Sequence, residues 1–482
     1  MHGLTSLATA GLIATALVAP PVQAQSPNAA ALDHPPLSTG ADFNLDGFPD
    51  VVTSIPGNRD GEGLPNDGAV RVIYGGGKGE VYITQDSPGV PDVGEAGDLF
   101  GQALTTWYSP YDDYPNLVVG APGEAVGTQV AAGQITVFPG GPDGLSLNGY
   151  LYNQDSPGVP GVAETGDRFG WSLSGGEPGG WFNYGTLAIG APGEDDNAVD
   201  AGSVTLIGNE QIKVVHQDSP GIPGSQEKGD RFGYSVTLLR DVLVVGVPYE
   251  SIGSVAGAGL AQVMTVRRSD VPNPDWPKPQ PMVNLDQGTP GVSGTPETGD
   301  HFGWSVSLAT AEGEIDTRYD LTVGVPDESI GSVPRGGGVQ AFELDDPFDD
   351  RSPDWAEHLS TNQDKPGVPG VVEEGDRFGS SVDAVKGVYG LVHTVGSDGE
   401  FTDAEIGRSR SAIHVFSGEV FGAVWVRAGL CNIPADEVLR TNHLSVDGTH
   451  LYVAASGDER ILGVPWRNIL FGTSDPLVVL IA

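Results

Sequence analysis

The stretch Gln154-Asp-Ser-Pro-Gly-Val-Pro160, followed by Gly166-Asp-Arg-Phe-Gly170, recurs through the chain with small variations. An interval that stays fixed while the units vary in length indicates one structural module with loops of different size. Function is then expected on a surface built by several modules. Five copies begin with a Gln and reach an Asp 13 residues later, starting at Gln85, Gln154, Gln217, Gln287 and Gln363 and reaching Asp98, Asp167, Asp230, Asp300 and Asp376.

The module between Asp167 and Gln217 shows the strand pattern most clearly. Residues 169–174 alternate between apolar and small, as in a half-buried strand, and residues 186–190 form an apolar run that ends in Ala-Pro-Gly. Residues 202–207 and 211–216 complete four short strands. Four antiparallel strands in each unit predict the blade of a β-propeller.

The same pattern extends to both ends of the chain and predicts an all-β fold, a seven-bladed β-propeller of four-stranded antiparallel blades. Residues 50–56 and 70–74 supply most of a first blade, and residues 438–446, 451–455 and 461–466 resemble a last one. The strand at 477–482 is expected to pair with the N-terminal segment and close the fold. The blades are expected at residues 35–86, 98–155, 167–218, 230–286, 300–364, 376–430 and 438–482.

Composition limits the classes of function. The chain of 482 residues carries 64 acidic and 23 basic residues, a net charge of −41, which should repel nucleic acid and anionic membranes and attract divalent cations or cationic partners. The 72 glycines and 38 prolines separate strands rather than indicate disorder, because 38% of the residues are apolar. Cys431 is the only cysteine, so no internal disulfide is expected.

Residues 1–24 are predicted to be a secretory signal peptide. The apolar run 7–18 is too short to cross a bilayer, and residues 22–24 offer small side chains for cleavage near Ala24. No later segment is apolar enough for membrane insertion. Residues 25–482 are therefore expected to form a single secreted propeller domain.

The segment Asp42-Phe-Asn-Leu-Asp-Gly-Phe-Pro-Asp50 has the spacing of a metal-binding loop. Oxygen-bearing side chains stand at positions 1, 3, 5 and 9, Gly at position 6 allows a sharp turn, and a backbone carbonyl is available at position 7. All-oxygen ligands in a flexible loop favour calcium. The alternative is a turn in which Asn and Asp satisfy local backbone groups. The predicted ligands are Asp42, Asn44, Asp46, Phe48 (through its carbonyl) and Asp50.

Together, these features resemble the FG-GAP repeats of the integrin α-subunit propeller, which also occur in secreted bacterial proteins. The resemblance extends from about residue 42 to about residue 466, and it implies a propeller that binds calcium and acts in extracellular adhesion. Loops equivalent to 42–50 in the other modules lack the full ligand set, so one calcium ion is expected. The resemblance rests on Phe-Gly pairs at 100–101, 169–170, 232–233, 302–303 and 378–379, and on Gly-Ala/Val-Pro turns at 120–122, 190–192, 246–248 and 324–326.

Acidic residues recur in two kinds of loop that a propeller places on one face. This face is predicted to carry an acidic rim where a cationic ligand could dock, although a repeated motif more often belongs to the framework. One set lies ten residues after each Gln and the other follows the second strand. Together they are Glu95, Glu124, Glu164, Glu194, Glu227, Glu250, Glu297, Glu328 and Glu373.

The sequence favours a non-catalytic, monomeric binding or adhesion module whose partner is an extracellular protein or glycan. It contains no nucleophile elbow and no His-Glu-x-x-His pair, and its nine histidines show no ligand-like clustering in sequence. The aromatic residues of the variable loops are interpreted mainly as loop packing. The alternatives are a secreted hydrolase or lyase acting on carbohydrate or ester, and an inhibitor or partner subunit of another secreted enzyme.

Overall fold

The structure is a computed structural model, and it forms an all-β propeller of antiparallel sheets. Residues 1–37 separate from residues 38–482 as a unit of their own, and the fold described here belongs to the second unit. The expected signal peptide lies outside the described residues. Those residues are 41–55, 64–176, 185–208, 211–266, 280–310, 318–345, 355–387, 390–399, 412–417, 420–426, 438–446, 450–456, 460–465, 469 and 478–480.

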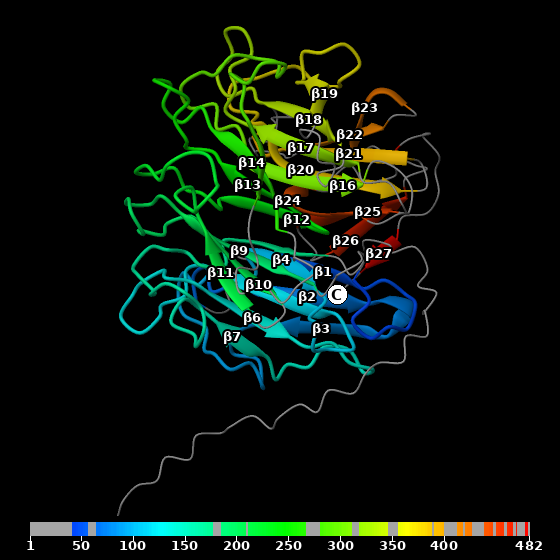
Figure 1. Ribbon diagram of the computed structural model, residues 1–482. Helices are drawn as coiled ribbons and strands as arrows, with labels where there is room; N and C mark the ends of the chain where they lie inside the picture. Colours follow the sequence, from blue (N-terminus) through cyan, green and yellow to red (C-terminus); the bar gives the residue numbers. More distant parts are fainter. Residues whose placement is uncertain are drawn as a thin grey trace, which may run out of the picture. The chain divides into compact units, whose positions relative to one another are not determined.

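The described strands follow one another along the chain as successive sheets (Figure 1). The first three sheets contain β1 (Val51–Ile55), β2 (Ala69–Tyr74) and β3 (Gly79–Ile83); β4 (Ala103–Trp107), β5 (Asn116–Ala121), β6 (Gln134–Phe138) and β7 (Tyr150–Tyr152); and β8 (Ser172–Gly175), β9 (Leu187–Ala191), β10 (Ser203–Gly208) and β11 (Gln211–Val215).

The remaining sheets contain β12 (Ser235–Leu239), β13 (Val242–Val247), β14 (Leu260–Thr265) and β15 (Gln280–Leu285); β16 (Ser305–Thr310), β17 (Tyr319–Val325), β18 (Gly338–Leu344) and β19 (Trp355–Thr361); β20 (Phe378–Gly387), β21 (Gly390–Ser397), β22 (Ala412–Ser417) and β23 (Val420–Val426); and β24 (Val438–Val446), β25 (His450–Ser456), β26 (Arg460–Pro465) and β27 (Val478–Leu480).

The expectation of seven four-stranded blades is wrong as stated. The described residues form six four-stranded sheets, and the sheet β1–β2–β3 has three strands. The final strand also differs from expectation, because β27 pairs with β26 as the outer strand of its own sheet. A short apolar run indicates a strand, but the partner of that strand depends on contacts that the run itself does not encode.

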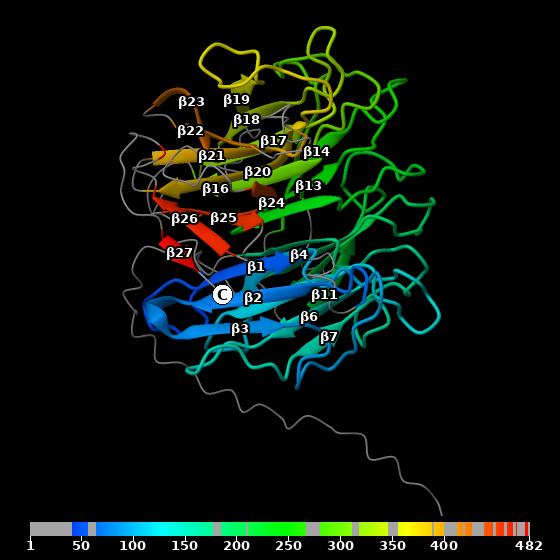
Figure 2. The same ribbon diagram turned by 180° about the vertical axis from the view of Figure 1, so that it is seen from behind.

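Neighbouring sheets meet through their first strands. β4 contacts β8, β8 contacts β12, β12 contacts β16, β16 contacts β20, and β20 contacts β24. β24 also contacts β1, so the last sheet lies beside the first, and both ribbon views show this neighbourhood (Figures 1 and 2). The second strands β5, β9, β13 and β17 are buried along their whole length because sheets cover both of their faces.

A Phe and a Gly join each module to the one before it. Phe232 is fully buried and forms a parallel bridge with Gly202, which precedes β10 of the preceding sheet. Gly202 has φ +84°, and a Cβ atom there would lie 2.3 Å from the carbonyl oxygen of Phe232. Only glycine allows this approach. The same bridge joins Gly68 to Phe100, Gly133 to Phe169, Gly259 to Phe302 and Gly337 to Phe378.

None of the helices among the described residues has the length and apolar character needed to cross a membrane.

Candidate functional site

The repeated Asp fixes the connection between sheets. Asp230 is buried, and its Oδ2 accepts a 2.6 Å hydrogen bond from the backbone N–H of Glu227. The next residue, Arg231, has a left-handed backbone with φ +59°. Such a conformation costs a non-glycine residue roughly 1 kcal/mol, and it persists where the surroundings impose it. The equivalent left-handed residues are Leu99, Arg168, His301 and Arg377.

In four of the five copies, the repeated Gln is hydrogen-bonded to a Glu of the next module. Gln85 Nε2 donates a 2.7 Å hydrogen bond to Glu124 Oε2, although 39 residues separate them. Burial and neighbouring carboxylates raise the pKa of Glu124 to about 8. The same bond joins Gln154 to Glu194, Gln217 to Glu250 and Gln287 to Glu328, and burial raises the pKa of each of these three glutamates to about 7.

The predicted acidic rim therefore divides into two sets. Glu124 is buried, and Glu194, Glu250 and Glu328 are part-buried, so these four belong to the framework and do not form an exposed docking surface. Their side chains turn inward because the buried Gln amides need acceptors. The side chains of the other set are exposed, and they are Glu95, Glu164, Glu227, Glu297 and Glu373.

The predicted calcium loop is a hydrogen-bonded turn. Asp42 Oδ2 accepts the N–H of Gly47 at 2.9 Å, and Asn44 Oδ1 accepts the N–H of Asp46 at 3.0 Å. Asp46 Oδ2 is buried without a hydrogen-bond partner among the described residues, and Lys78 Nζ lies 3.7 Å from it. A buried carboxylate oxygen that lacks a hydrogen bond, in this ring of oxygens, fits a metal cation as well as it fits Lys78.

Asp50, the last predicted ligand, faces the backbone. Its Oδ1 accepts the N–H of Gly75 at 2.8 Å and its Oδ2 accepts the N–H of Phe43 at 2.8 Å. Burial raises the pKa of Asp50 to about 6. The fit to calcium is thus best for Asp42, Asn44 and Asp46, whereas Asp50 anchors the turn. The Phe48 side chain is exposed.

Aromatic side chains from three modules form one cluster. Tyr234 lies at the centre, with its ring centroid 5.6 Å from that of Trp171 and 4.7 Å from that of Trp304. Tyr249 lies 6.0 Å from Tyr234 and 4.6 Å from His301. Trp171, Tyr234 and Trp304 each follow a Phe-Gly pair, so the repeat itself places them beside one another.

Two arginines with left-handed backbone conformations, Arg168 and Arg231, place their guanidinium groups over rings of this cluster. The guanidinium of Arg231 lies 4.6 Å from the ring centroid of Tyr249, and that of Arg168 lies 5.2 Å from that of Trp171. Burial raises the pKa of Tyr234 above its usual range, while three nearby arginines (168, 231 and 377) oppose that rise. We call these five aromatic rings, Trp171, Tyr234, Tyr249, His301 and Trp304, and the three arginines the arginine–aromatic cluster.

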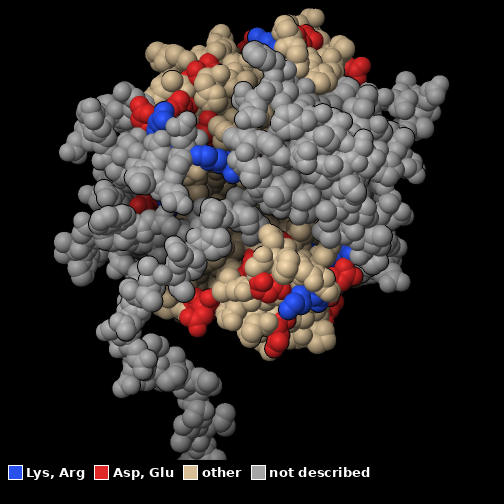
Figure 3. Space-filling view, turned by 90° about the vertical axis from the view of Figure 1, so that its right-hand side faces the viewer, with Lys and Arg blue, Asp and Glu red and all other residues tan. Residues whose placement is uncertain are grey.

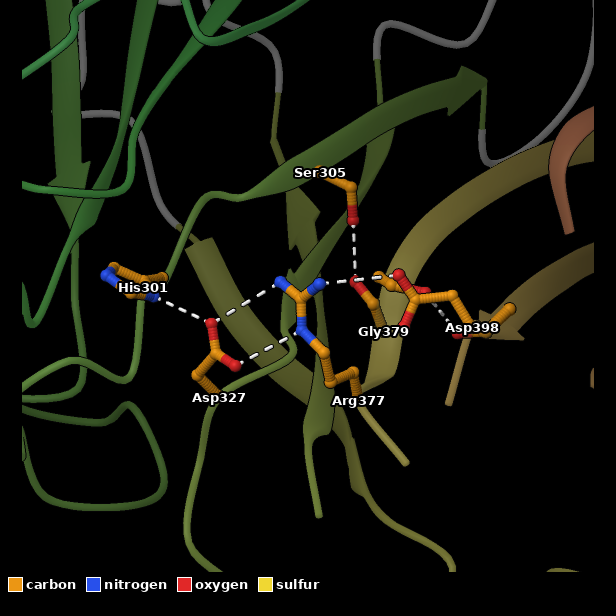
Figure 4. Close-up of polar contacts among 8 residues, drawn as sticks. His301, Ser305, Asp327, Arg377, Gly379 and Asp398 are labelled. Carbon is orange, nitrogen blue, oxygen red and sulfur yellow. Dashed lines mark hydrogen bonds and ion pairs between the residues drawn. The ribbon is translucent and has the colours of Figure 1, made fainter. Parts of the chain in front are cut away.

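One arginine of the cluster is neutralised and two are not. Arg377 stacks on Trp304 at 4.7 Å and pairs with Asp327 at 3.2 Å and with Asp398 at 3.3 Å (Figure 4). His301 contacts Asp327 from the other side at 2.8 Å. Burial acts to raise the pKa of Asp327, but His301 and Arg377 outweigh it and hold that pKa below its usual range.

Arg168 and Arg231 form no ion pair with any residue that the structure describes. Arg71, Lys78 and Arg318, by contrast, have acidic partners, and several basic residues adjoin acidic ones on the face drawn in Figure 3. Two unpaired arginines held against aromatic rings are unexpected in a chain of net charge −41. They leave a local positive site suited to an anionic group.

Sequence reasoning missed this cluster because it interpreted the loop aromatics as packing and assigned Trp171 to a half-buried strand. Aligning the modules would have shown that the positions on either side of Phe-Gly vary while the frame does not. Those positions hold Arg168 and Trp171, Arg231 and Tyr234, and His301 and Trp304 in three successive modules. Residues that vary between modules at a position fixed by the repeat indicate a candidate binding site.

Comparisons with known proteins give distant similarities. No protein-family model matches the chain. Phosphatidylinositol-glycan-specific phospholipase D of Mus musculus is 28% identical over 222 residues, covering 44% of this chain and 25% of that protein. The Rattus norvegicus protein of the same name is 27% identical over 222 residues, covering 43% of this chain and 25% of its own. The chain thus matches about a quarter of the length of these relatives.

Two solved structures resemble the fold. The periplasmic gluconolactonase PpgL of Pseudomonas aeruginosa is 12% identical with a TM-score of 0.43, over 86% of this chain and 92% of that one. Sqt1 of Chaetomium thermophilum is 14% identical with a TM-score of 0.39, over 86% and 77%. These identities and TM-scores are too low to assign the chain to a family.

Proposed function

We propose that the protein is a secreted, non-catalytic binding module of the FG-GAP type, which takes an anionic group of an extracellular protein or glycan at the arginine–aromatic cluster. The observation that carries the proposal is the pair of unpaired arginines, Arg168 and Arg231, held over aromatic rings. A ligand carboxylate or sulfate would supply the counter-ion that the described residues do not.

Geometry favours a fixed rather than an adaptable contact. The left-handed backbone at Arg168 and Arg231 is held by buried aspartates, and the rings beneath restrict each guanidinium. Little side-chain entropy is then lost on binding, which raises affinity. The net charge of −41 opposes the approach of a polyanion, so the preferred ligand presents one acidic group rather than many.

The test measures binding of the full chain to carboxylated, sulfated and neutral glycans and to acidic and neutral peptides. We expect acidic ligands to bind, and an R168Q/R231Q variant to bind them at least about tenfold more weakly, since a charged hydrogen bond contributes roughly 1.5–3 kcal/mol. Arg240→Gln is the matched control, because Arg240 also has a positive φ of 54° but lies outside the cluster. Equal affinity of the double variant and the wild type would refute the proposal.

The hydrolase or lyase alternative predicts something different. It requires turnover of an ester or glycoside by the wild-type chain, together with loss of turnover when a carboxylate is replaced. Binding of an acidic ligand without any turnover supports the binding module. Measured turnover would replace it.

We also propose that calcium binds the 42–50 loop and stabilises the fold. The buried Asp46 Oδ2, which has no hydrogen-bond partner among the described residues, supports this. Calcium should raise the unfolding temperature of the wild type but not that of Asp46→Ala. If calcium has the same effect on both proteins, the loop is a turn and holds no ion.

A further inference from the structure

Three side chains with metal-ligating atoms meet where the sheet β16–β19 contacts the sheet β20–β23. Asp320 comes from β17, His358 from β19 and His393 from β21. His358 Nε2 lies 2.6 Å from Asp320 Oδ2, and His393 Nδ1 lies 3.7 Å from Asp320 Oδ1. One ligand atom from each residue lies within 4.8 Å of the other two. Histidines that are far apart in sequence are thus brought together by the fold.

Asp320 is the least satisfied member of the group. Its side chain is 3% exposed, and its Oδ1 is buried without a hydrogen-bond partner among the described residues. The 3.7 Å between this oxygen and His393 Nδ1 is too long for a hydrogen bond. It is also shorter than the roughly 4.5 Å or more that a bridging water needs. Two ligands on one tetrahedral zinc ion, with bonds of about 2.0 Å, lie about 3.3 Å apart.

The group also departs from the repeat. Counting back three residues from the Gly that ends the second-strand run, four other modules have a buried leucine, and this one has His393, which is 6% exposed. A histidine in a leucine position needs a polar partner to repay its burial. Thr322 Oγ1, 2.8 Å from His393 Nδ1, supplies that contact in the metal-free chain, and a metal ion bound at Nδ1 would replace it. The leucines are Leu117, Leu187, Leu243 and Leu321.

A β-bulge directs the third ligand. Leu359 pairs with Ala341 and Glu357 with Phe342, which leaves His358 as the extra residue of its strand. The same bulge occurs between β14 and β15, so it belongs to the frame, whereas a histidine there does not. The His358 side chain is 37% exposed, so solvent reaches one side of the group.

We propose that Asp320, His358 and His393 bind one divalent transition-metal ion of the zinc class, with water completing its coordination. Two imidazoles and one carboxylate suit zinc better than calcium, which prefers oxygen ligands throughout. The ion joins two neighbouring sheets, since its ligands come from both. This site is separate from the 42–50 loop and does not depend on the proposed ligand-binding function.

The test uses the full chain, stripped with a chelator and then dialysed against zinc. The wild type should retain one more equivalent of zinc per chain than His358→Gln, and cobalt should give the visible absorption of a four-coordinate site in the wild type but not in His358→Gln. His216→Gln is the matched control, because His216 also lies near an aspartate, Asp196, at 3.3 Å, and it should keep the extra equivalent.

A second variant keeps the result interpretable if folding is disturbed. His393→Leu restores the residue that the other modules carry, so the fold should remain intact while the zinc equivalent is lost. Asp46→Ala should retain zinc, which distinguishes this site from the calcium loop. If wild type, His358→Gln and His393→Leu bind equal zinc, the metal is held by the acidic surface in general and the proposal is wrong.

Discussion

Replacing Glu124 with Gln should change how the stability of the protein depends on pH. Burial raises the pKa of Glu124 from 4.5 to about 8. A raised pKa means that the folded state prefers the protonated acid. The stability from this group is therefore fully present below about pH 4.5 and is lost as pH rises toward 8.

The size of the effect follows from the shift. A rise of about 3.5 pKa units corresponds to ~5 kcal/mol as a ceiling, and allowance for solvent screening brings the expected loss to roughly 2 kcal/mol. Protonated Glu124 hydrogen-bonds Asp98, and the amide of a glutamine can donate in its place. The Gln85 amide keeps its acceptor in both proteins.

The assay is denaturant unfolding at pH 5, 6, 7 and 8, in the presence of a chelator so that metal binding does not contribute. Glu124→Gln should match the wild type at pH 5 and exceed it by roughly 2 kcal/mol at pH 8. Glu373→Gln replaces an exposed glutamate at the position equivalent to Glu95 in another module, which does not act on the pKa of Glu124; it is the control and should follow the wild type. A Glu124→Gln variant that is less stable than wild type at pH 8 would show that the buried carboxyl is not the cause.

Three further predictions concern the frame and the cluster. Phe232→Ala empties a fully buried position and should lower the free energy of unfolding by roughly 3–5 kcal/mol in denaturant titration, whereas Phe48→Ala, at a position 56% exposed, should change it little. Gly202→Ala should prevent folding, or lower the free energy of unfolding by more than the roughly 1 kcal/mol expected for Gly229→Ala. Gly229 has a similar positive φ, but open space surrounds it. Equal losses in the two variants would mean that the bridge to Phe232 tolerates a methyl group. Because the pKa of Asp327 is lowered in the folded state, its charge stabilises the wild type above about pH 4, and this stability is lost as the pH falls. Asp327→Asn should remove this contribution. Unchanged acid unfolding of the variant would mean that His301 and Arg377 do not stabilise the charge.

The strands were largely predictable from the sequence because their pattern is local. The runs at 186–190 and 202–207 correspond to β9 and β10, and both are buried throughout. Turn residues bound each run, so element positions follow from neighbours in the sequence. The partner of the last strand was not predictable in this way, because β27 could be placed only by its tertiary contact with β26.

The site was less predictable because its members lie far apart in the chain. The sequence shows recurring Gln and Glu residues, but only the fold shows that Gln85 bonds Glu124 and withdraws it from the surface. His358 and His393 are likewise brought together by packing between two sheets. Counting histidines along the chain could not reveal this pair. Aligning the modules would at least have marked His393 as an exception among leucines.

The left-handed residue between Asp and Phe has a consequence for how new specificities can arise. Its backbone is set by the neighbouring Asp and by the Phe–Gly bridge, and it already holds Leu99, Arg168, Arg231, His301 and Arg377 in different modules. Five side chains of different size and charge are thus accepted at one point of a single scaffold. Under the proposed binding function, substitutions at these points would change the ligand preference one residue at a time and leave the buried core unaltered.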